Sequence, residues 1–219
     1  MPDSALSLFE NRDRNDRPKT QAERTALAET RMLAAAIELL NTAGIQGATL
    51  KAIGEKAGYS RGLATHHFGN KAGLFRKLLR ELSAVWVREL QDKVGDKTGL
   101  EALSAANEAH LKHVLERPHQ LRAMYILWFG SLDPGSEFKP NLARFMKLQR
   151  ESMAEWVCGG QRKGEIRQDA DPERMGEQLY ANLIGVNHQW LVDPEIDLAR
   201  AYLEMKQNSW RLLKPGPDG

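Results

Sequence analysis

Residues 49–71 read TLKAIGEKAGYSRGLATHHFGNK, a stretch that predicts two short helices joined by a tight turn. Thr49 can cap the first helix, whose apolar residues recur with the 3.6-residue period of one helix face. Gly58 tolerates the left-handed conformation that often ends a helix, and Ser60 is placed to cap the next one. Because only two residues separate the helices, they must cross sharply. This arrangement is the helix-turn-helix.

The second helix of such a pair enters the major groove of DNA with its N-terminal residues against the base edges. Arg61 offers a planar fork of donors that suits guanine, and Gly62 leaves room for close approach. Asn70 is the expected cap of a third helix, so the ammonium group of Lys71 and the first amides of that helix can bind a phosphate together. The residues predicted to contact a double-stranded DNA operator are Thr49, Ser60, Arg61, Gly62, Leu63, Thr65, His66 and Lys71.

The same stretch resembles the signature of the TetR (tetracycline-repressor) family of bacterial one-component regulators. The matching residues are Ala57-Gly58-Tyr59-Ser60-Arg61-Gly62, His67-Phe68, Lys71 and Leu74, preceded by Ala35-Ala36, Leu39-Leu40, Gly44 and Thr49. The resemblance covers residues 25–80 and implies that His67 contacts a DNA phosphate. Two positions depart from the pattern, because Ala64 and Thr65 stand where the family usually has a large aliphatic residue and then a tyrosine. That tyrosine commonly reaches a phosphate, so the contact is either lost here or passed to Thr65 or His66.

Composition sets the class of protein. The 219 residues can form one small and one larger domain, and 42% hydrophobic with 27% charged residues is typical of a soluble globular chain. The net charge is only +2, but residues 20–76 carry seven Lys or Arg against four Glu. The single cysteine, Cys158, excludes an intrachain disulfide and suits a reducing compartment. Without an apolar run long enough for a signal peptide or a membrane span, the sequence predicts a cytoplasmic protein with no membrane partner.

The chain before residue 80 divides into a tail and a DNA-binding domain. Residues 1–19 mix both signs of charge and predict a flexible tail, with a minor-groove arm as the alternative. A capping box, Thr20-Gln-Ala-Glu23, opens a helix that ends near Gly44. After Asn70 a long helix runs to about Gly95. We therefore predict a helix-turn-helix domain over 20–76 and an effector-binding and dimerisation domain over 77–219.

Five more helices are expected after Gly95, over residues 100–116, 118–129, 137–158, 172–192 and 195–213. Asp171-Pro172 and Asp193-Pro194 each place an Asp cap before a proline at the first helical position. The glycine-rich segment 159–164 lacks the spacing of a phosphate-binding loop and predicts an ordinary loop. Since no alternating strand pattern interrupts these segments, the predicted fold class is all-α. It comprises a three-helix DNA-binding domain and a larger helical domain, about nine helices in total.

The last two helices each carry an apolar stripe. The resemblance implies that they pair with their counterparts in a four-helix interface of a homodimer, whose two-fold symmetry fits a palindromic operator. Packing within one subunit is the alternative. The residues predicted for the dimer interface are Leu179, Leu183, Val186, Trp190, Leu198, Ala201, Tyr202 and Met205.

The middle helices hold aromatic and polar residues that could line a pocket for a small apolar or amphipathic effector. The resemblance implies that an effector binds in this region, while each residue taken alone could equally belong to the core. The residues predicted for effector binding are His110, Met124, Tyr125, Trp128, Phe129, Met153, Trp156, Asn182 and His188.

Two other functions stay open at this stage. His110, His113 and Glu116 share a spacing that could form a three-ligand zinc face, as in an all-α metal-dependent enzyme with a vestigial helix-turn-helix. A regulator without any effector is the other alternative. No nucleophile motif or metal-binding motif supports catalysis. The leading hypothesis is a non-enzymatic, cofactor-free transcriptional repressor that binds its operator as a homodimer and is released by a small-molecule effector.

Overall fold

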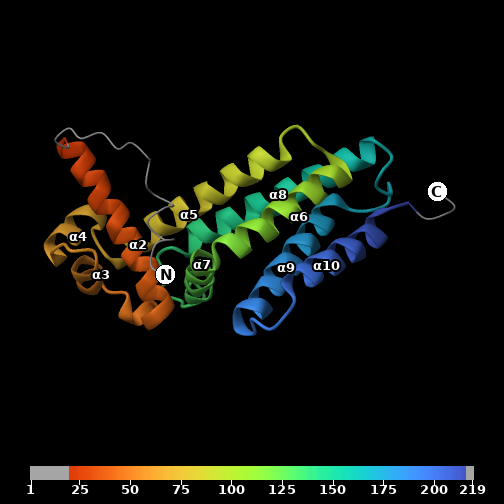
Figure 1. Ribbon diagram of the computed structural model, residues 1–219. Coiled ribbons are helices and arrows are strands. Elements are labelled where there is room, and N and C mark those ends of the chain that lie inside the picture. Colours follow the sequence, from red (N-terminus) through yellow and green to blue (C-terminus); the bar gives the residue numbers. More distant parts are fainter. Residues whose placement is uncertain (1–19, 216–219) are drawn as a thin grey trace. The chain divides into compact units, whose positions relative to one another are not determined.

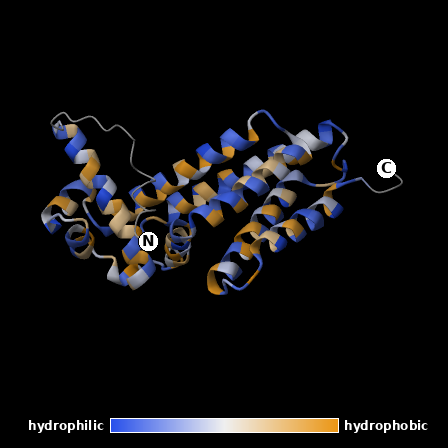
Figure 2. Cartoon of the chain, viewed as in Figure 1, coloured by the Kyte–Doolittle hydropathy of each residue, from blue (hydrophilic) through white to orange (hydrophobic). Residues whose placement is uncertain are grey.

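The computed structural model describes residues 20–215, and every regular element in that range is an α-helix (Figure 1). These residues form nine helices and no strand, which confirms the predicted all-α fold. The tail predicted over residues 1–19 lies outside the described residues. Hydrophobic and hydrophilic residues alternate along the helices (Figure 2), as expected of helices that bury one face. None of the described helices is both long and apolar enough to cross a membrane.

The described chain divides into two compact units. Unit 1 comprises residues 20–82 and 117–142, and it contains α2 (Gln21–Gly47), α3 (Leu50–Lys56), α4 (Arg61–Phe68), the first half of α5 (Lys71–Val94) and α7 (Pro118–Gly130). Unit 2 comprises residues 83–116 and 143–215, and it contains the rest of α5, α6 (Gly99–Glu116), most of α8 (Lys139–Arg162), α9 (Pro172–Val192) and α10 (Leu198–Leu213). The DNA-binding domain over 20–76 and the effector-binding domain over 77–219 stay a prediction. The two compact units show how the chain packs, and not which residues bind DNA or an effector.

Helix α2 begins at the predicted capping box and is interrupted near its end. The hydroxyl of Thr20 accepts a hydrogen bond from the amide of Glu23 at 3.2 Å, and the carboxylate of Glu23 accepts one from the amide of Thr20 at 2.7 Å. Gly44, where the sequence predicts the end of this helix, has a φ of 63° and a ψ of −171°. Only glycine adopts this conformation without strain, so the chain changes direction there before a last turn reaches Gly47.

Unit 1 has one hydrophobic core, which holds the DNA-binding helices in place. Ile53 of α3, Ala64 of α4 and Leu74 of α5 are fully buried. They pack with the buried face of α2 in a single cluster. Burying a large aliphatic side chain such as Ile53 or Leu74 stabilises a fold by about 1.5–3 kcal/mol. Helix α4 is held in this core by Ala64 and Phe68, which pack in the same cluster as side chains of α2, α3 and α5.

Helix α7 contributes to the same core. Ala123 and Leu127 are fully buried in the cluster of unit 1. Asn41 of α2 donates hydrogen bonds from its amide nitrogen to the carbonyl of Ile37 at 2.8 Å and to the carbonyl of His119 at 2.9 Å. This side chain therefore ties the start of α7 to α2, although the two helices are far apart in the sequence.

Unit 2 contains two further hydrophobic clusters. One is built from Trp86, Leu90 and Val94 of α5 against the alanine-rich face of α6. The other joins Leu103 of α6, Val157 of α8, Ile166 and Leu213 of α10. Small alanine side chains on α6 allow its backbone to lie close to the large side chains of α5.

Two boundaries differ from those predicted. Helix α8 continues to Arg162, whereas the sequence predicts a loop from Gly159. These glycines are packed rather than flexible. A Cβ on Gly159 would lie 2.8 Å from the Cβ of Thr98, and one on Gly160 would lie 2.5 Å from the side chain of Ile166. Glycine is thus required here for close approach within a helix, not for a turn.

Helix α10 begins at Leu198 and not at residue 195. Asp193 ends α9, and the carboxylate of Asp193 accepts a hydrogen bond from the amide of Glu195 in the following turn at 3.2 Å. The cap of α10 is instead Asp197, whose carboxylate accepts from the amide of Arg200 at 3.0 Å. Asp193-Pro194, which the sequence predicts as a helix start, therefore forms a local Asx turn before the helix. At Asp171-Pro172 the predicted cap and proline start are confirmed.

Candidate functional site

The two predicted helix caps of the helix-turn-helix are present. The hydroxyl of Thr49 accepts a hydrogen bond from the amide of Ala52 at 3.1 Å, and the hydroxyl of Ser60 accepts one from the amide of Leu63 at 3.1 Å. Both cap residues are exposed. A hydroxyl that accepts a capping bond keeps its own hydrogen, so each of these groups can still donate to a phosphate oxygen.

Two glycines set the tight turn between α3 and α4. Gly58 has a φ of 80°, which favours glycine. A Cβ on Gly54 would lie 3.0 Å from the carbonyl oxygen of Ser60 and 3.1 Å from that of Tyr59. The amide of Tyr59 in turn donates to the carbonyl of Gly54 at 2.8 Å. The missing side chain at Gly54 therefore lets the backbone of the turn approach α3 closely.

Helix α4 has a buried side and an exposed side. Ala64 and Phe68 are buried in the core of unit 1. The exposed side carries four of the residues predicted to contact DNA, while two more, Leu63 and His67, are partly buried. The exposed residues are Arg61, Gly62, Thr65 and His66. Ala64, one of the two departures from the family pattern, is fully buried, so this departure changes the packing of the core and not the exposed side of the helix.

The side chains on the exposed side of α4 are available for a partner. Within the part of the chain that the structure describes, Arg61 makes no hydrogen bond or ion pair. Thr65 is exposed at the position where the TetR pattern has a tyrosine. The rings of His66 and His67 meet edge to face with 5.8 Å between their centroids, and His67 also lies 5.9 Å from the ring of Phe68. Of the two imidazoles, that of His66 is the more accessible.

Lys71 has a different environment from the one predicted. Asn70 caps α5 as expected, since its side-chain oxygen accepts from the amide of Gly73 at 2.7 Å. The ammonium group of Lys71, however, donates a hydrogen bond to the carbonyl oxygen of Ile45 and lies 5.7 Å from the ring centre of Phe75. Burial lowers the pKa of Lys71. The phosphate contact of Lys71 stays a prediction, and it requires this side chain to turn away from Ile45.

The residues predicted for effector binding are divided between the two units. Unit 1 holds those of α7, where Met124 and Tyr125 are buried and Phe129 is 50% exposed. The ring of Trp128 lies 4.9 Å from that of Tyr125. Unit 2 holds the remaining five. Asn182 is exposed, and the other four are partly buried: His110, Met153, Trp156 and His188.

Unit 2 contains a buried polar network that sequence reasoning found only in part. The hydroxyl of Tyr202 contacts Nδ1 of His110 at 2.7 Å and donates to Oδ1 of Asn187 at 2.8 Å. The indole nitrogen of Trp86 donates to Oε1 of Gln149 at 2.9 Å. Neither Asn187 nor Gln149 was predicted. A signal for Asn187 exists in the sequence, because it lies four residues after Leu183 on the apolar side of its helix.

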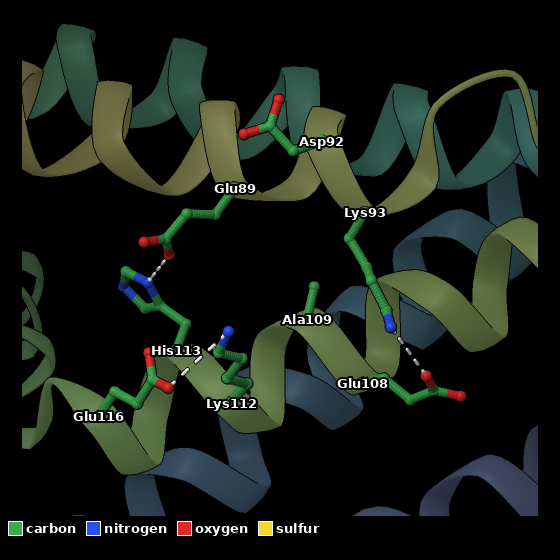
Figure 3. A pocket seen from close by; sticks show the side chains of 8 residues that line it. All are labelled: Glu89, Asp92, Lys93, Glu108, Ala109, Lys112, His113 and Glu116. Carbon is green, nitrogen blue, oxygen red and sulfur yellow. Dashed lines mark hydrogen bonds and ion pairs between the residues drawn. The ribbon is translucent and has the colours of Figure 1, made fainter.

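An open cleft of about 340 Å³ lies between α5 and α6. Its lining consists mostly of charged side chains, which Figure 3 shows. Glu89 and His113 point toward one another there, with 2.6 Å between Oε2 and Nδ1. Lys93 pairs with Glu108 at 3.5 Å on the other side. The lining includes none of the residues predicted to bind an effector.

The zinc face considered as an alternative does not form among the described residues. His113 is directed to Glu89, Nδ1 of His110 is directed to Tyr202, and Glu116 pairs with Lys112 at 3.8 Å. Among the described residues, no three His, Cys, Asp or Glu side chains are grouped so that they could hold a metal ion. The helical spacing is as predicted, but each of the three side chains has another neighbour.

The stripes predicted for a dimer interface are partly used within the chain. Leu183, Leu198 and Tyr202 are buried in unit 2. The other five remain partly exposed: Leu179, Val186, Trp190, Ala201 and Met205. Large apolar side chains that are more exposed lie elsewhere on α9 and α10, including Leu203 at 53% and Val192 at 73%.

Comparison with known proteins identifies the module. Residues 32–78, from the middle of α2 to the first half of α5, match the family model described as bacterial regulatory proteins, tetR family. These residues belong to the TetR family of regulatory proteins. Curated relatives of the chain include two proteins named HTH-type transcriptional regulator BetI. These relatives are regulators and not enzymes, in agreement with the prediction.

The similarity to these relatives is partial. BetI of Burkholderia lata is 31% identical over 86 residues, which cover 37% of this chain and 44% of that protein. BetI of Stenotrophomonas maltophilia is 26% identical over 131 residues, which cover 58% of this chain and 63% of that protein. The chain thus spans about half the length of the curated relatives that it matches.

Solved structures share the fold over most of the chain. SmeT in complex with triclosan has a TM-score of 0.72 at 21% identity, covering 87% of this chain and 93% of SmeT. NalD, the secondary repressor of the MexAB-OprM multidrug efflux pump in Pseudomonas aeruginosa, has a TM-score of 0.68 at 21% identity, covering 90% of this chain and all of NalD. At this identity the likeness shows the fold alone.

Proposed function

We propose that this TetR-family protein is a transcriptional repressor that binds a palindromic operator as a homodimer and is released by a small-molecule effector. The observation that carries the DNA-binding part is the two-sided character of α4. Ala64 and Phe68 anchor this helix in the core, while Arg61, Thr65 and His66 face outward. A rigid helix that begins with a guanidinium group unpaired over residues 20–215 is suited to reading base edges in the major groove.

Backbone contacts would come from the helix caps and their neighbours. Thr49 and Ser60 are exposed and each keeps a hydroxyl hydrogen, so they can donate to phosphate oxygens while still capping α3 and α4. Thr65 and His66 are the exposed residues nearest to the place of the missing tyrosine. We assign the replacement contact to His66, because an imidazole reaches further from the helix than the short hydroxyl side chain of Thr65.

A homodimer would use α9 and α10. Leu203 on α10 and Val192 at the end of α9 are large apolar side chains that are more than half exposed, and water-exposed leucine and valine are better buried against a second copy. Two-fold symmetry would then present two copies of α4 to successive major grooves of a palindromic site.

An effector bound in the predicted effector-binding domain, residues 77–219, would act because its affinity differs between two geometries of the dimer. If the geometry that binds the effector no longer fits successive grooves, the effector shifts the population away from DNA. The buried aromatic rings near His110 and on α7 favour an apolar or amphipathic molecule. Because SmeT shares the fold and has been solved with triclosan, triclosan is a reasonable first compound to test for release of DNA.

The test of DNA binding is selection of bound sequences from a random pool by the purified protein at near-physiological salt. The expected result is a palindromic motif, with loss of preference at one base pair of each half-site in Arg61→Ala. A good bidentate contact to a base contributes about 1–3 kcal/mol of discrimination. Lys51→Ala is a suitable control, since it removes the same charge from an exposed site on α3. Equal losses by Arg61→Ala on operator and random DNA would exclude base readout, and absence of any enriched motif would contradict the proposal.

A further inference from the structure

Buried polar groups from four helices are matched in pairs inside unit 2. Tyr202 of α10 and Asn187 of α9 are each 1% exposed, and Trp86 of α5 and Gln149 of α8 are 7% and 9% exposed. A buried polar group that lacks a hydrogen-bond partner costs about 1–3 kcal/mol, so such groups are normally paired. Each of these four side chains has a partner within the network.

The hydrogens of this network determine the state of His110. The hydroxyl of Tyr202 has one hydrogen, which it donates to Oδ1 of Asn187 at 2.8 Å. The oxygen of Tyr202 must therefore accept in its 2.7 Å contact with Nδ1 of His110, and Nδ1 must carry the hydrogen. A neutral imidazole has a single N–H group. Its other nitrogen, Nε2, is then a hydrogen-bond acceptor with a free lone pair.

The surroundings keep this imidazole neutral. The ring of His110 lies 4.6 Å from that of Trp86, edge to face, and is stacked on the ring of Tyr202 at 6.1 Å. Part of the residue remains exposed, while both aromatic rings lie against the imidazole. Burial, with a smaller effect of the neighbouring His113, lowers the pKa of His110 to about 3. Tautomer and charge are thus both fixed at physiological pH.

Nε2 of His110 is the unmatched atom of this network. Over residues 20–215, His110 is bonded to Tyr202 and contacts the two rings, and a hydrogen bond to its own backbone raises its pKa slightly. None of these interactions uses Nε2 as an acceptor. Glu89, the nearby carboxylate, is already paired with His113 at 2.6 Å. A cation bound at Nε2 would lose its hydration without gaining a free carboxylate as a partner. An anion that carries no hydrogen could not donate a hydrogen bond to Nε2. The complementary group is an uncharged donor.

We propose that Nε2 of His110 accepts a hydrogen bond from an uncharged hydroxyl group of the effector, and that Tyr202 and Asn187 are positioning residues that hold the accepting tautomer. This proposal rests on the proposed function in so far as the bound molecule is an effector. The ligand class is an apolar, neutral molecule that carries a hydroxyl group, such as a phenol. Trp86, at the edge of the same imidazole, supplies an apolar surface beside the hydroxyl.

The experiment compares hydroxyl compounds with their methyl ethers by calorimetry on the full chain. The probes are phenol and anisole, 2-naphthol and 2-methoxynaphthalene, and 4-phenylphenol and 4-methoxybiphenyl. In at least one pair the hydroxyl compound should bind about tenfold more tightly, because a single neutral hydrogen bond is lost in the ether and an acceptor is left unpaired. Equal affinities within every pair, or no binding by any hydroxyl compound, would overturn the proposal.

Three variants separate acceptance at Nε2 from a general structural effect. In His110→Asn the amide nitrogen can replace Nδ1 as donor to Tyr202, but nothing replaces Nε2, so the preference for the hydroxyl compound should disappear. In His110→Gln the amide oxygen lies near the former Nε2, and the preference should persist. Tyr202→Phe frees the tautomer and should reduce the preference. If His110→Asn weakens hydroxyl compound and ether equally, His110 is structural and the proposal is wrong.

Operator selection by the wild-type protein distinguishes this failure from that of the proposed function. A protein that selects a palindromic motif but binds the members of every pair equally remains a repressor with a different effector chemistry. A protein that prefers hydroxyl compounds but selects no DNA keeps the ligand site and loses the assignment as a repressor.

Discussion

The ammonium group of Lys71 donates a hydrogen bond to the carbonyl oxygen of Ile45, so the first residue of α5 is bonded to the last turn of α2. This bond joins residues 26 positions apart in the sequence, and the helix-turn-helix lies between them. The carbonyl of Ile45 is available to a side chain because α2 ends at Gly47, and the amide of Thr49 donates to the carbonyl of Gly47 at 2.8 Å instead.

Replacement of Lys71 by alanine should therefore destabilise the DNA-free protein. A hydrogen bond from a charged donor contributes more than a neutral one, and partial exposure reduces its effect, so we expect the free energy of unfolding to fall by about 1 kcal/mol. Urea denaturation measures this change. Lys71→Arg, which keeps a charged donor, is the control and should lose less. An unchanged midpoint and slope in Lys71→Ala would mean that the bond to Ile45 contributes nothing to stability.

The same variant tests the predicted phosphate contact. If Lys71 turns toward DNA on binding, Lys71→Ala should reduce the slope of log affinity against log salt concentration by about 1 for each bound protomer. Fluorescence anisotropy on the selected operator at several salt concentrations gives this slope. A loss of stability together with an unchanged salt slope would show that Lys71 stays on Ile45 in the complex and contacts no phosphate.

Gly54 and Gly62 differ in what a side chain would meet, and so should their alanine variants. A Cβ at Gly54 would lie 3.0–3.2 Å from backbone atoms of Tyr59 and Ser60, whereas at Gly62 only the hydroxyl of Ser60 lies within reach, at 3.7 Å. Gly54→Ala should lower the melting temperature and DNA affinity together. Gly62→Ala should preserve or raise stability, since alanine is favoured over glycine in a helix by about 1 kcal/mol. Its added methyl group should still weaken operator binding, and normal affinity in Gly62→Ala would exclude close approach of the duplex at that position.

Much of the fold follows from local sequence signals. Caps at Thr20, Thr49 and Ser60, each followed by a helical pattern, predict where α2, α3 and α4 begin, because capping depends on residues within one turn. The end of α8 was missed for the opposite reason. Gly160 looks like a helix breaker, but a close approach to Ile166 determines its role, and that contact appears only after folding.

The candidate sites also include features that local sequence predicts and features that depend on tertiary contacts. Exposure of Arg61 and Thr65 follows from helical periodicity, once Ala64 and Phe68 are assigned to the core. The network around His110 does not follow, because Tyr202 is 92 residues away in the sequence and the state of the imidazole depends on which neighbour takes the hydroxyl hydrogen. The spacing of His110 and His113 suggested shared ligation, whereas tertiary contacts give each ring a different partner.

Stability at acid pH should depend on His110. In the unfolded chain this group takes up a proton near pH 6.5, but in the folded protein only near pH 3. The unfolded state therefore binds more protons across this range, and stability falls as the pH is lowered from 6.5 toward 3. One such group contributes at most about 1.4 kcal/mol per pH unit. Denaturation midpoints between pH 7 and pH 4 should decline less steeply in His110→Asn, and an identical decline would mean that His110 is not held neutral.

Leu203 and Leu115 provide a matched test of the dimer. Both are leucines with just over half of their surface exposed, at 53% on α10 and 54% on α6. A charge placed in an apolar interface loses its hydration and weakens association, whereas the same charge on a free surface costs little. Leu203→Glu should therefore shift the mass measured by light scattering from dimer to monomer at micromolar concentration, with unchanged helical circular dichroism. Leu115→Glu should remain a dimer. If Leu203→Glu stays dimeric while Leu115→Glu dissociates, the protomers associate through the surface that includes α6 and not through α10.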